Sequence, residues 1–292
     1  MKCHPSQQNR RTRRSGFTLV ELLVVIVIIG ILMSLILPAL AGARNRARIG
    51  QVSAEISQLD NAIAKFKSVY NVEPPSSLYI PAVGGTWEAS DRSKVRGIWP
   101  QFDFASNGGL GTGNFHLSGA ECLVFFLGGI RTTTTPPAML GFSKNPRFPW
   151  SSSGTNREGP FFEFNNSRFL DKDGDTVLEY ADALPAQTAP YVYFSSQGRS
   201  YFKANSGGTS LSEQDDFDVL GGNSNSADFS AIYLKTLTPA VPQRPNGYQI
   251  ISPGFDGLYG VGGVYTDGSE LTLTRAAEAD NITNFSGGPL KP

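Results

Sequence analysis

The chain has 292 residues, of which 40% are hydrophobic and 17% are charged, so it is long enough to bury one sizeable core. Its 25 basic and 25 acidic residues balance, but the basic residues of the first 16 positions have no acidic counterpart there. Without that leader, 20 basic residues face 25 acidic ones. This excess of acid disfavours a nucleic-acid-binding protein, because such proteins concentrate Lys and Arg on one face.

A membrane-length apolar segment follows the basic leader. Residues 22–43 carry no charge, and about 20 apolar residues suffice for a helix to cross a bilayer. Glu21 lies at the start of this segment, and an acidic side chain at the bilayer centre costs about 2.5 to 3.5 kcal/mol on insertion scales. If the chain is cut between Gly16 and Phe17, the new amine of Phe17 lies one helical turn from Glu21. That amine can neutralise Glu21 of the same chain or of a neighbouring copy.

Two simpler interpretations of this segment compete. Residues 39–41 (Ala-Leu-Ala) fit the cleavage pattern of a secretory signal, but the apolar region is longer than such signals have. A plain signal anchor that only spans the membrane is the other alternative. Both leave the placement of Gly16 and Glu21 unexplained.

An amphipathic helix is predicted to continue the apolar segment over residues 44–72. Apolar side chains recur there every three or four residues and form one stripe, at Ile49, Val52, Ile56, Leu59, Ile63, Phe66 and Tyr70. Pro74 and Pro75 stop the helix, and Pro38 is expected to kink it or to melt one turn. We expect the stripe to pack on a downstream sheet.

Residues 73–292 are predicted to form a β-rich domain, which gives an α+β fold with a long N-terminal helix, an antiparallel sheet and long loops. Short aromatic and β-branched runs predict strands at residues 161–164, 191–194, 200–202 and 248–251. A second helix is expected over residues 118–127, ended by two glycines. Three segments are expected to be loops, at residues 84–113, 132–155 and 206–228.

The sequence contains no recognisable catalytic motif. Once the leader is removed, Cys122 is the only cysteine and His116 the only histidine, so an internal disulfide and His-rich zinc sites are excluded. No G-x-S-x-G turn presents a serine nucleophile. We therefore expect that the protein is not an enzyme.

The N-terminal pattern resembles that of a known family. Residues 16–26, Gly-Phe-Thr-Leu-Val-Glu-Leu-Leu-Val-Val-Ile, are similar to the leader and first segment of type IV pilin-like proteins, including the pseudopilins of type II secretion. The resemblance implies that a prepilin peptidase cuts between Gly16 and Phe17 and methylates the Phe17 amine. It also implies that Glu21 is the residue that guides assembly into a filament.

The resemblance implies a location and a set of partners as well. Residues 1–16 would be the cleaved leader, residues 17–43 a single span of the bacterial inner membrane, and residues 73–292 a periplasmic domain, with the N-terminus in the cytoplasm. The expected partners are membrane lipid, the prepilin peptidase, an inner-membrane assembly platform, and further pilin-like subunits, including other copies of this chain. The alternative from another class is a membrane-anchored periplasmic binding or adhesive module with the same leader.

Two acidic clusters are candidate sites for structural calcium, which prefers oxygen ligands. In the major pseudopilin group, which residues 252–260 resemble, a loop near the C-terminus often holds calcium, and the matching acids here are Asp256, Asp267 and Asp280. The second cluster consists of alternating carboxylates around a glycine, at Asp171, Asp173, Asp175 and Glu179. The alternative for the second cluster is a solvated Asp-Gly turn.

Overall fold

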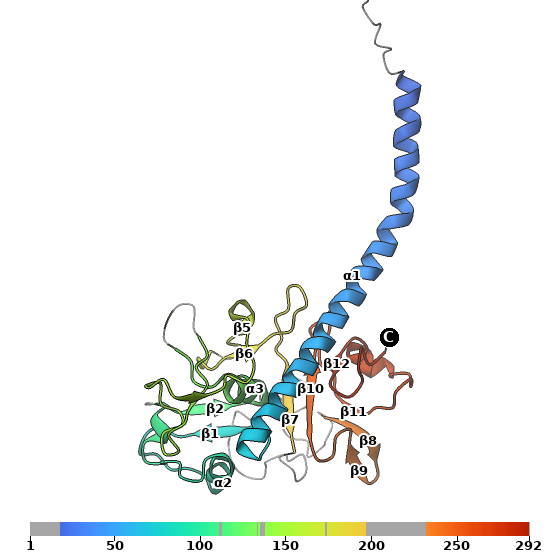
Figure 1. Cartoon of the computed structure of the whole chain (residues 1–292). Coiled ribbons are helices and arrows are strands. Elements are labelled where there is room, and N and C mark those ends of the chain that lie inside the picture. Colours follow the sequence, from blue (N-terminus) through green and yellow to red (C-terminus); the bar gives the residue numbers. More distant parts are fainter. Residues whose placement is uncertain are drawn as a thin grey trace, which may run out of the picture. The chain divides into compact units, whose positions relative to one another are not determined.

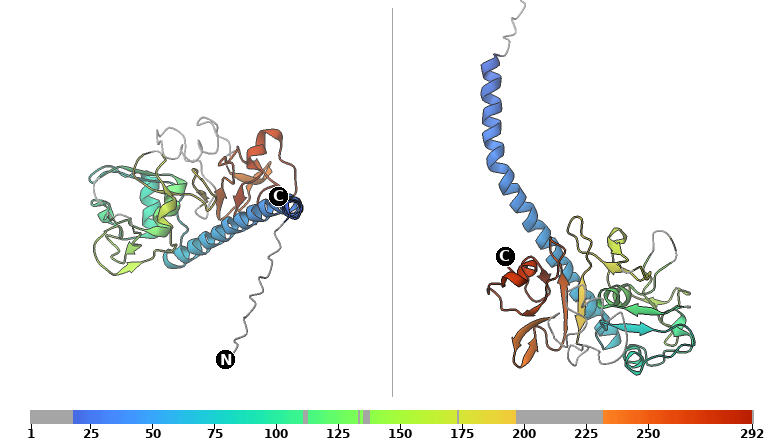
Figure 2. Two further views of the ribbon diagram at one scale, coloured as in Figure 1. Left: turned by 90° about the horizontal axis from the view of Figure 1, so that it is seen from above. Right: turned by 180° about the vertical axis from the view of Figure 1, so that it is seen from behind.

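The computed structural model describes residues 18–110, 113–132, 134, 138–172, 174–196 and 232–291. It divides the chain into two compact units, Met1–Ala47 and Arg48–Pro292. The main helix, α1 (Leu19–Tyr70), begins in the first unit and ends in the second (Figures 1 and 2). The predicted α+β fold, in which a long apolar N-terminal helix precedes antiparallel sheets, is confirmed.

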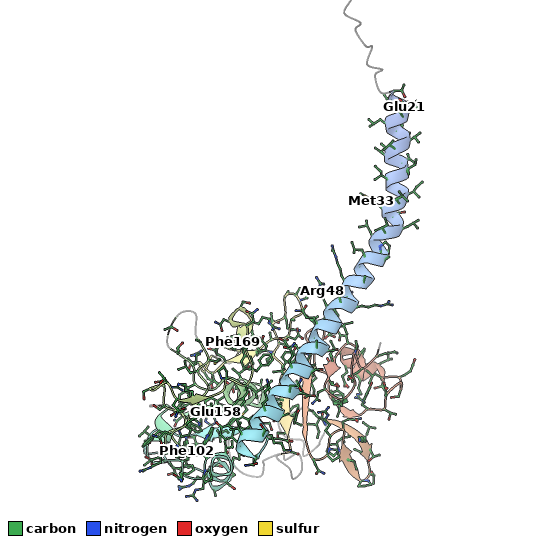
Figure 3. The ribbon with its side chains drawn as sticks, in the orientation of Figure 1. Glu21, Met33, Arg48, Phe102, Glu158 and Phe169 are labelled. Atoms are coloured by element: carbon green, nitrogen blue, oxygen red, sulfur yellow. The ribbon has the colours of Figure 1, made fainter. Side chains whose placement is uncertain are left out.

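In the first unit, α1 is apolar and exposed on all sides. Among the described residues, α1 is the one helix long and apolar enough to cross a membrane, with a mean hydropathy of 3.1 over its most apolar window. Figure 3 shows its side chains projecting around the helix between Glu21 and Met33. The helix continues through Pro38, so the expected loss of a turn there does not occur. A proline removes one backbone donor, and the neighbouring hydrogen bonds can still hold the helix.

In the second unit, the predicted stripe of α1 is buried as expected. Val52, Ile56, Leu59, Ile63 and Phe66 are at most 2% exposed and belong to the main hydrophobic core. The remaining two stripe residues are partly buried against the same core. The stripe therefore fixes which face of the helix packs on the β-rich part of this unit.

The end of α1 has a local cause. The helix ends at Tyr70, and Asn71 adopts the left-handed conformation with φ 62°, which asparagine tolerates better than most residues. The backbone N–H of Asn71 donates to the carbonyl of Lys67 at 2.8 Å, which satisfies one of the last helical carbonyls. The stop therefore comes before the two prolines that predict it.

Three-stranded and two-stranded sheets make up the β-rich part. The central strand β10 pairs with β7 and β12 in an antiparallel sheet, and β8 pairs with β9 and with the parallel strand β11 (Figure 1). The bounds are β7 (Val192–Ser195), β8 (Tyr233–Leu237), β9 (Ala240–Pro242), β10 (Tyr248–Ser252), β11 (Gly263–Val264) and β12 (Ile282–Thr283). The remaining strands form antiparallel pairs, namely β1 (Leu78–Ile80) with β2 (Phe115–Leu117), β3 (Phe142–Ser143) with β4 (Arg157–Glu158), and β5 (Phe169–Leu170) with β6 (Glu179–Tyr180).

The predicted second helix is present as α3 (Gly119–Gly128) and contacts β6 and β7. It starts with a capping box, in which the Ser118 hydroxyl accepts from the Glu121 backbone at 3.4 Å and the Glu121 carboxylate accepts from the Ser118 backbone at 2.7 Å. The described residues also contain short 3-10 helices, namely η1 (Asn107–Gly109), η2 (Asn166–Arg168) and η4 (Leu273–Glu278).

The predicted strand at residues 161–164 is wrong. The backbone N–H groups of Phe161 and Phe162 donate to the carbonyl of Leu127 at 2.7 and 3.3 Å, so this segment caps the end of α3 instead of pairing with a strand. Its aromatic side chains pack into the core from irregular backbone, which a local β-pattern cannot distinguish from a strand.

Two of the predicted loops contain ordered structure. Residues 84–113 include the helix α2 (Ala89–Ile98), and residues 132–155 include β3. Their aromatic residues explain the difference, because Trp99 and Trp150 are 5% and 0% exposed and hold these segments to the core. The predicted strand at 200–202 and the predicted loop at 206–228 lie outside the described residues.

Candidate assembly site at the start of the first helix

A reciprocal cap closes the first turn of α1. Glu21 Oε2 accepts from the backbone N–H and from the hydroxyl of Thr18, both at 2.8 Å, and the Thr18 hydroxyl accepts from the Glu21 backbone at 3.2 Å. This is a capping box, in which a threonine and a glutamate three residues later satisfy each other's backbone donors. The Thr-x-x-Glu pattern signals this role of Thr18, which was not predicted from the sequence.

The cap changes what Glu21 requires from a partner. The Thr18 donors hold Oε2, which reduces the cost of placing a carboxylate at the edge of an apolar segment. Among the described residues, no hydrogen bond reaches Oε1. That oxygen can accept from an ammonium group without breaking the cap. Gly16 and Phe17, which would form the cut and supply the amine, lie outside the described residues.

The surface of α1 that follows Glu21 is apolar and exposed. Large apolar side chains from Leu22 to Leu40 are 43 to 70% exposed. An exposed apolar surface of this extent is typical of a segment that contacts lipid or partner proteins. Membrane anchoring through α1 follows from this surface and from the length of the helix.

The C-terminal acids predicted to bind calcium are used by the backbone. Asp280 Oδ2 accepts from the N–H groups of Phe255 and Asp256 at 2.6 and 3.2 Å, and Asp256 Oδ1 accepts from Leu258 at 2.8 Å. Burial raises the pKa of Asp256, and the neighbouring Asp280 adds to the increase. Asp267 accepts instead from the Tyr265 hydroxyl at 3.4 Å. The first two acids thus close the same loop, whereas Asp267 has a separate partner.

The other acidic cluster forms turns. Asp171 accepts from Gly174 at 2.9 Å, Asp175 from Val177 at 2.7 Å, and Glu179 from the backbone of Lys172 at 3.0 Å. Asp173 lies outside the described residues. Within the described ranges, no three or more His, Cys, Asp and Glu side chains are grouped so that they could hold a metal ion. Calcium binding therefore stays a prediction.

The remaining candidate groups for chemistry have structural contacts. The His116 ring packs on Tyr79, with 4.4 Å between the ring centroids. Cys122 is buried in α3, and its thiol lies 3.7 Å from the carbonyl of Leu117. His116 thus lies in strand β2, and Cys122 is a buried residue of the main core.

A buried ion pair fixes α1 within the second unit, and sequence reasoning did not find it. The Glu55 carboxylate accepts hydrogen bonds from both terminal nitrogens of Arg168, one of them at 2.8 Å, and from the hydroxyl of Tyr191 at 2.7 Å. The Tyr180 hydroxyl lies near the same carboxylate, and the Arg168 guanidinium covers the Tyr180 ring at 4.5 Å. Burial raises the pKa of Tyr180 to about 12 and raises the pKa of Tyr191 well above its usual value, so both hydroxyls remain protonated donors.

The N-terminal segment is similar to known proteins. A family model described as the prokaryotic N-terminal methylation motif matches residues 11–37. Type II secretion system core protein G of Aeromonas hydrophila is 39% identical over 74 residues, which are 25% of this chain and 52% of that protein. The protein of the same name from Escherichia coli K12 is 44% identical over 55 residues, which are 19% of this chain and 38% of that protein. The one from Vibrio cholerae is 35% identical over 71 residues, which are 24% of this chain and 49% of that protein.

The chain spans about half the length of these curated relatives or less. No solved structure matches it. The matched motif contains Gly16, Phe17 and Glu21, the residues on which the predicted resemblance depends. That resemblance is confirmed: the chain carries the prokaryotic N-terminal methylation motif, and its N-terminal part is similar to the pseudopilins of type II secretion.

Proposed function

We propose that this protein is a pilin-like structural subunit that assembles with other pilin-like subunits in a type II secretion or related filament system. The observation that carries the proposal is the methylation motif followed by a single carboxylate in the first turn of an apolar, membrane-length helix. A structural role also fits the absence of a catalytic motif in the sequence.

The proposed processing and topology follow from the order of the segments. A prepilin peptidase removes residues 1–16 and methylates Phe17, and residues 17–43 anchor the product in the inner membrane. The basic leader keeps the N-terminus in the cytoplasm by the positive-inside tendency. The helix continues to Tyr70, and residues 73–292 form the periplasmic domain.

The proposed assembly contact is an ion pair between Glu21 and the Phe17 amine of a neighbouring copy. The capping box supports this proposal, because Thr18 orients the carboxylate through Oε2 and leaves Oε1 for the incoming cation. The same Thr18 bonds would lower the cost of holding Glu21 in lipid before the partner arrives. The inner-membrane assembly platform would then extract the neutralised segment.

Charge pairing and helix capping at Glu21 can be separated with matched variants. Glu21→Gln keeps a side chain that can cap Thr18 but removes the charge, whereas Thr18→Ala weakens the cap and keeps the charge. Filaments sheared from cells are quantified together with the subunit remaining in membranes. We expect Glu21→Gln to abolish assembly with normal insertion, and Thr18→Ala to reduce it less. Normal assembly of Glu21→Gln would refute the ion pair.

Processing is tested by mass spectrometry of the N-terminal peptide from the membrane-extracted protein. The proposal requires N-methylated Phe17 at the new terminus. A chain that starts at Gly42 would instead indicate secretory cleavage, and an intact leader would remove the amine on which assembly depends.

Calcium would serve only as a structural ion for the C-terminal loop. Metal binding to a folded protein adds to its stability, so a chelator should lower the melting temperature if calcium is bound. An unchanged melting temperature would remove calcium from the proposal.

A further inference from the structure

The antiparallel sheet of β12, β10 and β7 separates two hydrophobic cores of the second unit. Neighbouring residues of a strand point to opposite faces of a sheet, and the two cores follow this alternation. Tyr193 and Ile250 belong to the core that includes side chains of α2. Their neighbours Val192, Phe194 and Ile251 belong to the core that includes side chains of the C-terminal loops. The helix α2 and the C-terminal loops therefore lie on opposite sides of this sheet (Figures 1 and 2).

The C-terminal loops carry a group of exposed apolar side chains, which we call the C-terminal patch. Its members are Phe255, Leu258, Val261 and Leu273, of which each is at least 41% exposed and Leu273 is 97% exposed. The backbone that carries them is braced, because the buried Glu278 accepts from the N–H of Val261 at 3.2 Å and Asp280 accepts from the N–H of Phe255 at 2.6 Å. Apolar side chains that a braced backbone holds in solvent are typical of an interaction surface.

The segment that contains this patch is acidic. Residues 252–291 include five acidic and two basic residues. Both basic side chains already have a partner, because Arg275 lies 2.6 Å from Glu278. Lys291 lies 3.7 Å from Glu270. The acids without a basic partner among the described residues are Asp256, Asp267 and Asp280. A protein surface that matches this patch should therefore be basic.

The opposite side of the sheet has this complementary charge. Residues 77–157, which contribute to the same core as α2, include seven basic and four acidic residues. The guanidinium groups of Arg92 and Arg96 on α2 cover the Phe104 ring, with their Cζ atoms 4.5 and 5.4 Å from the ring centroid. Within the described ranges neither arginine forms an ion pair, although Glu88 precedes Arg92 by one helical turn. Arg92, Arg96 and Phe104, which we call the α2 face, combine an aromatic surface with donors for carboxylates.

We propose that the C-terminal patch of one copy docks on the α2 face of the next copy. The apolar side chains of the patch cover the Phe104 ring, and its acids pair with Arg92 and Arg96. Because the two surfaces lie on opposite sides of one molecule, the contact is heterologous and each copy can bind two others. A heterologous contact that does not close into a ring produces a helical array. The inference rests on the proposed filament function and adds to it a contact between copies that does not involve Glu21.

A photo-cross-linker at the tip of the patch tests this contact in the full chain. Leu273→p-benzoylphenylalanine changes a side chain that is 97% exposed, so the fold should be kept. Filaments sheared from cells are irradiated, and covalent dimers are separated by mass and mapped by mass spectrometry. We expect dimers and a ladder of larger species in which residue 273 is joined to residues 88–104 of another copy. The matched control is Leu237→p-benzoylphenylalanine, an apolar position of β8 that is 68% exposed and lies outside the patch, and it should give no such adduct.

Charge reversal tests the polar part of the contact. Arg96→Glu and Asp267→Arg change exposed side chains on the two surfaces. Each should lower the yield of the residue 273 adduct about fivefold, because a repulsive pair replaces an attractive one. The double variant should restore most of the yield. Loss of the adduct in both single variants without recovery in the double variant would overturn the pairing of the two surfaces.

The same cross-link is measured on the purified full chain in detergent, where no filament is required. Filaments that lack the adduct, or in which residue 273 is joined to any other segment, overturn the contact and leave the proposed function standing. The adduct in detergent from a chain that forms no filaments supports the contact and overturns the proposed function. A chain that gives neither filaments nor the adduct overturns both.

Discussion

The ion pair between Glu55 and Arg168 should contribute substantially to the stability of the second unit. Their side chains are 11% and 22% exposed, and the contact links α1 to a residue 113 positions away. Glu55→Gln would leave the Arg168 charge largely buried without an anion. Removing one partner of a buried pair typically costs 3 to 5 kcal/mol, and the partial exposure of Arg168 places the expected loss near the lower end, at about 3 kcal/mol.

The measurement is urea unfolding of the full chain in detergent, monitored by tryptophan fluorescence. The free energies of unfolding of wild type and variants are compared with the same dependence on urea concentration for all. Lys144→Gln is the matched control, because it breaks an ion pair whose side chains are 48% and 33% exposed. Surface pairs contribute about 0 to 1 kcal/mol, so this control should change stability by less than 1 kcal/mol.

The double variant Glu55→Met/Arg168→Met separates the pair from the desolvation cost of a lone charge. Replacing both partners with apolar groups is often nearly neutral, although Tyr191 then loses its acceptor. We expect the double variant to be more stable than Glu55→Gln, because it leaves no unpaired charge. A loss below 1 kcal/mol for Glu55→Gln would refute the argument, because it would mean that water reaches the pair in solution.

Two further predictions concern buried polar groups of the second unit. Burial raises the pKa of Asp182 despite its bonds from Ser252, Leu184 and Gln187. The native state therefore binds this proton more tightly than the unfolded state, and the contribution of Asp182 to stability falls as pH rises above about 3.9 towards the raised native value. When unfolding is measured from pH 4 to 8, the free energy of unfolding of Asp182→Asn should rise relative to that of wild type as pH rises. A difference that does not change with pH would contradict this prediction. Ser118→Ala should cost about 1 kcal/mol through the lost cap of α3, with Ser118→Asp close to wild type; equal losses in both would exclude capping.

The elements that the sequence predicts correctly have local signals. The stripe of α1 repeats with the helical period, and α3 is bounded by a Ser-x-x-Glu cap and two glycines. The strands β7 and β10 are rich in β-branched and aromatic residues. In each case neighbouring residues are sufficient to select the structure, so tertiary contacts do not need to be known.

The errors arise where distant contacts decide. Phe161 and Phe162 have a β-pattern, but the carbonyl of Leu127 in α3 takes their N–H groups. Trp99 and Trp150 follow segments rich in glycine and proline that resemble loops, yet their burial orders these segments. The Glu55–Arg168 pair spans 113 residues and has no local pattern, so a single sequence could not reveal it.

The two glutamates of α1 show why one is a candidate for assembly and the other is not. The Glu55 carboxylate is surrounded by Arg168 and two tyrosine hydroxyls, so both of its oxygens are satisfied within the chain. Among the described residues, Glu21 has partners on Oε2 alone, and it lies at the edge of a surface that these residues leave exposed. A carboxylate with unused capacity next to lipid is stable only when a further cation or donor arrives. This difference in hydrogen bonding, rather than residue type, supports the proposed intermolecular pairing of Glu21, whereas Glu55 is paired within the chain.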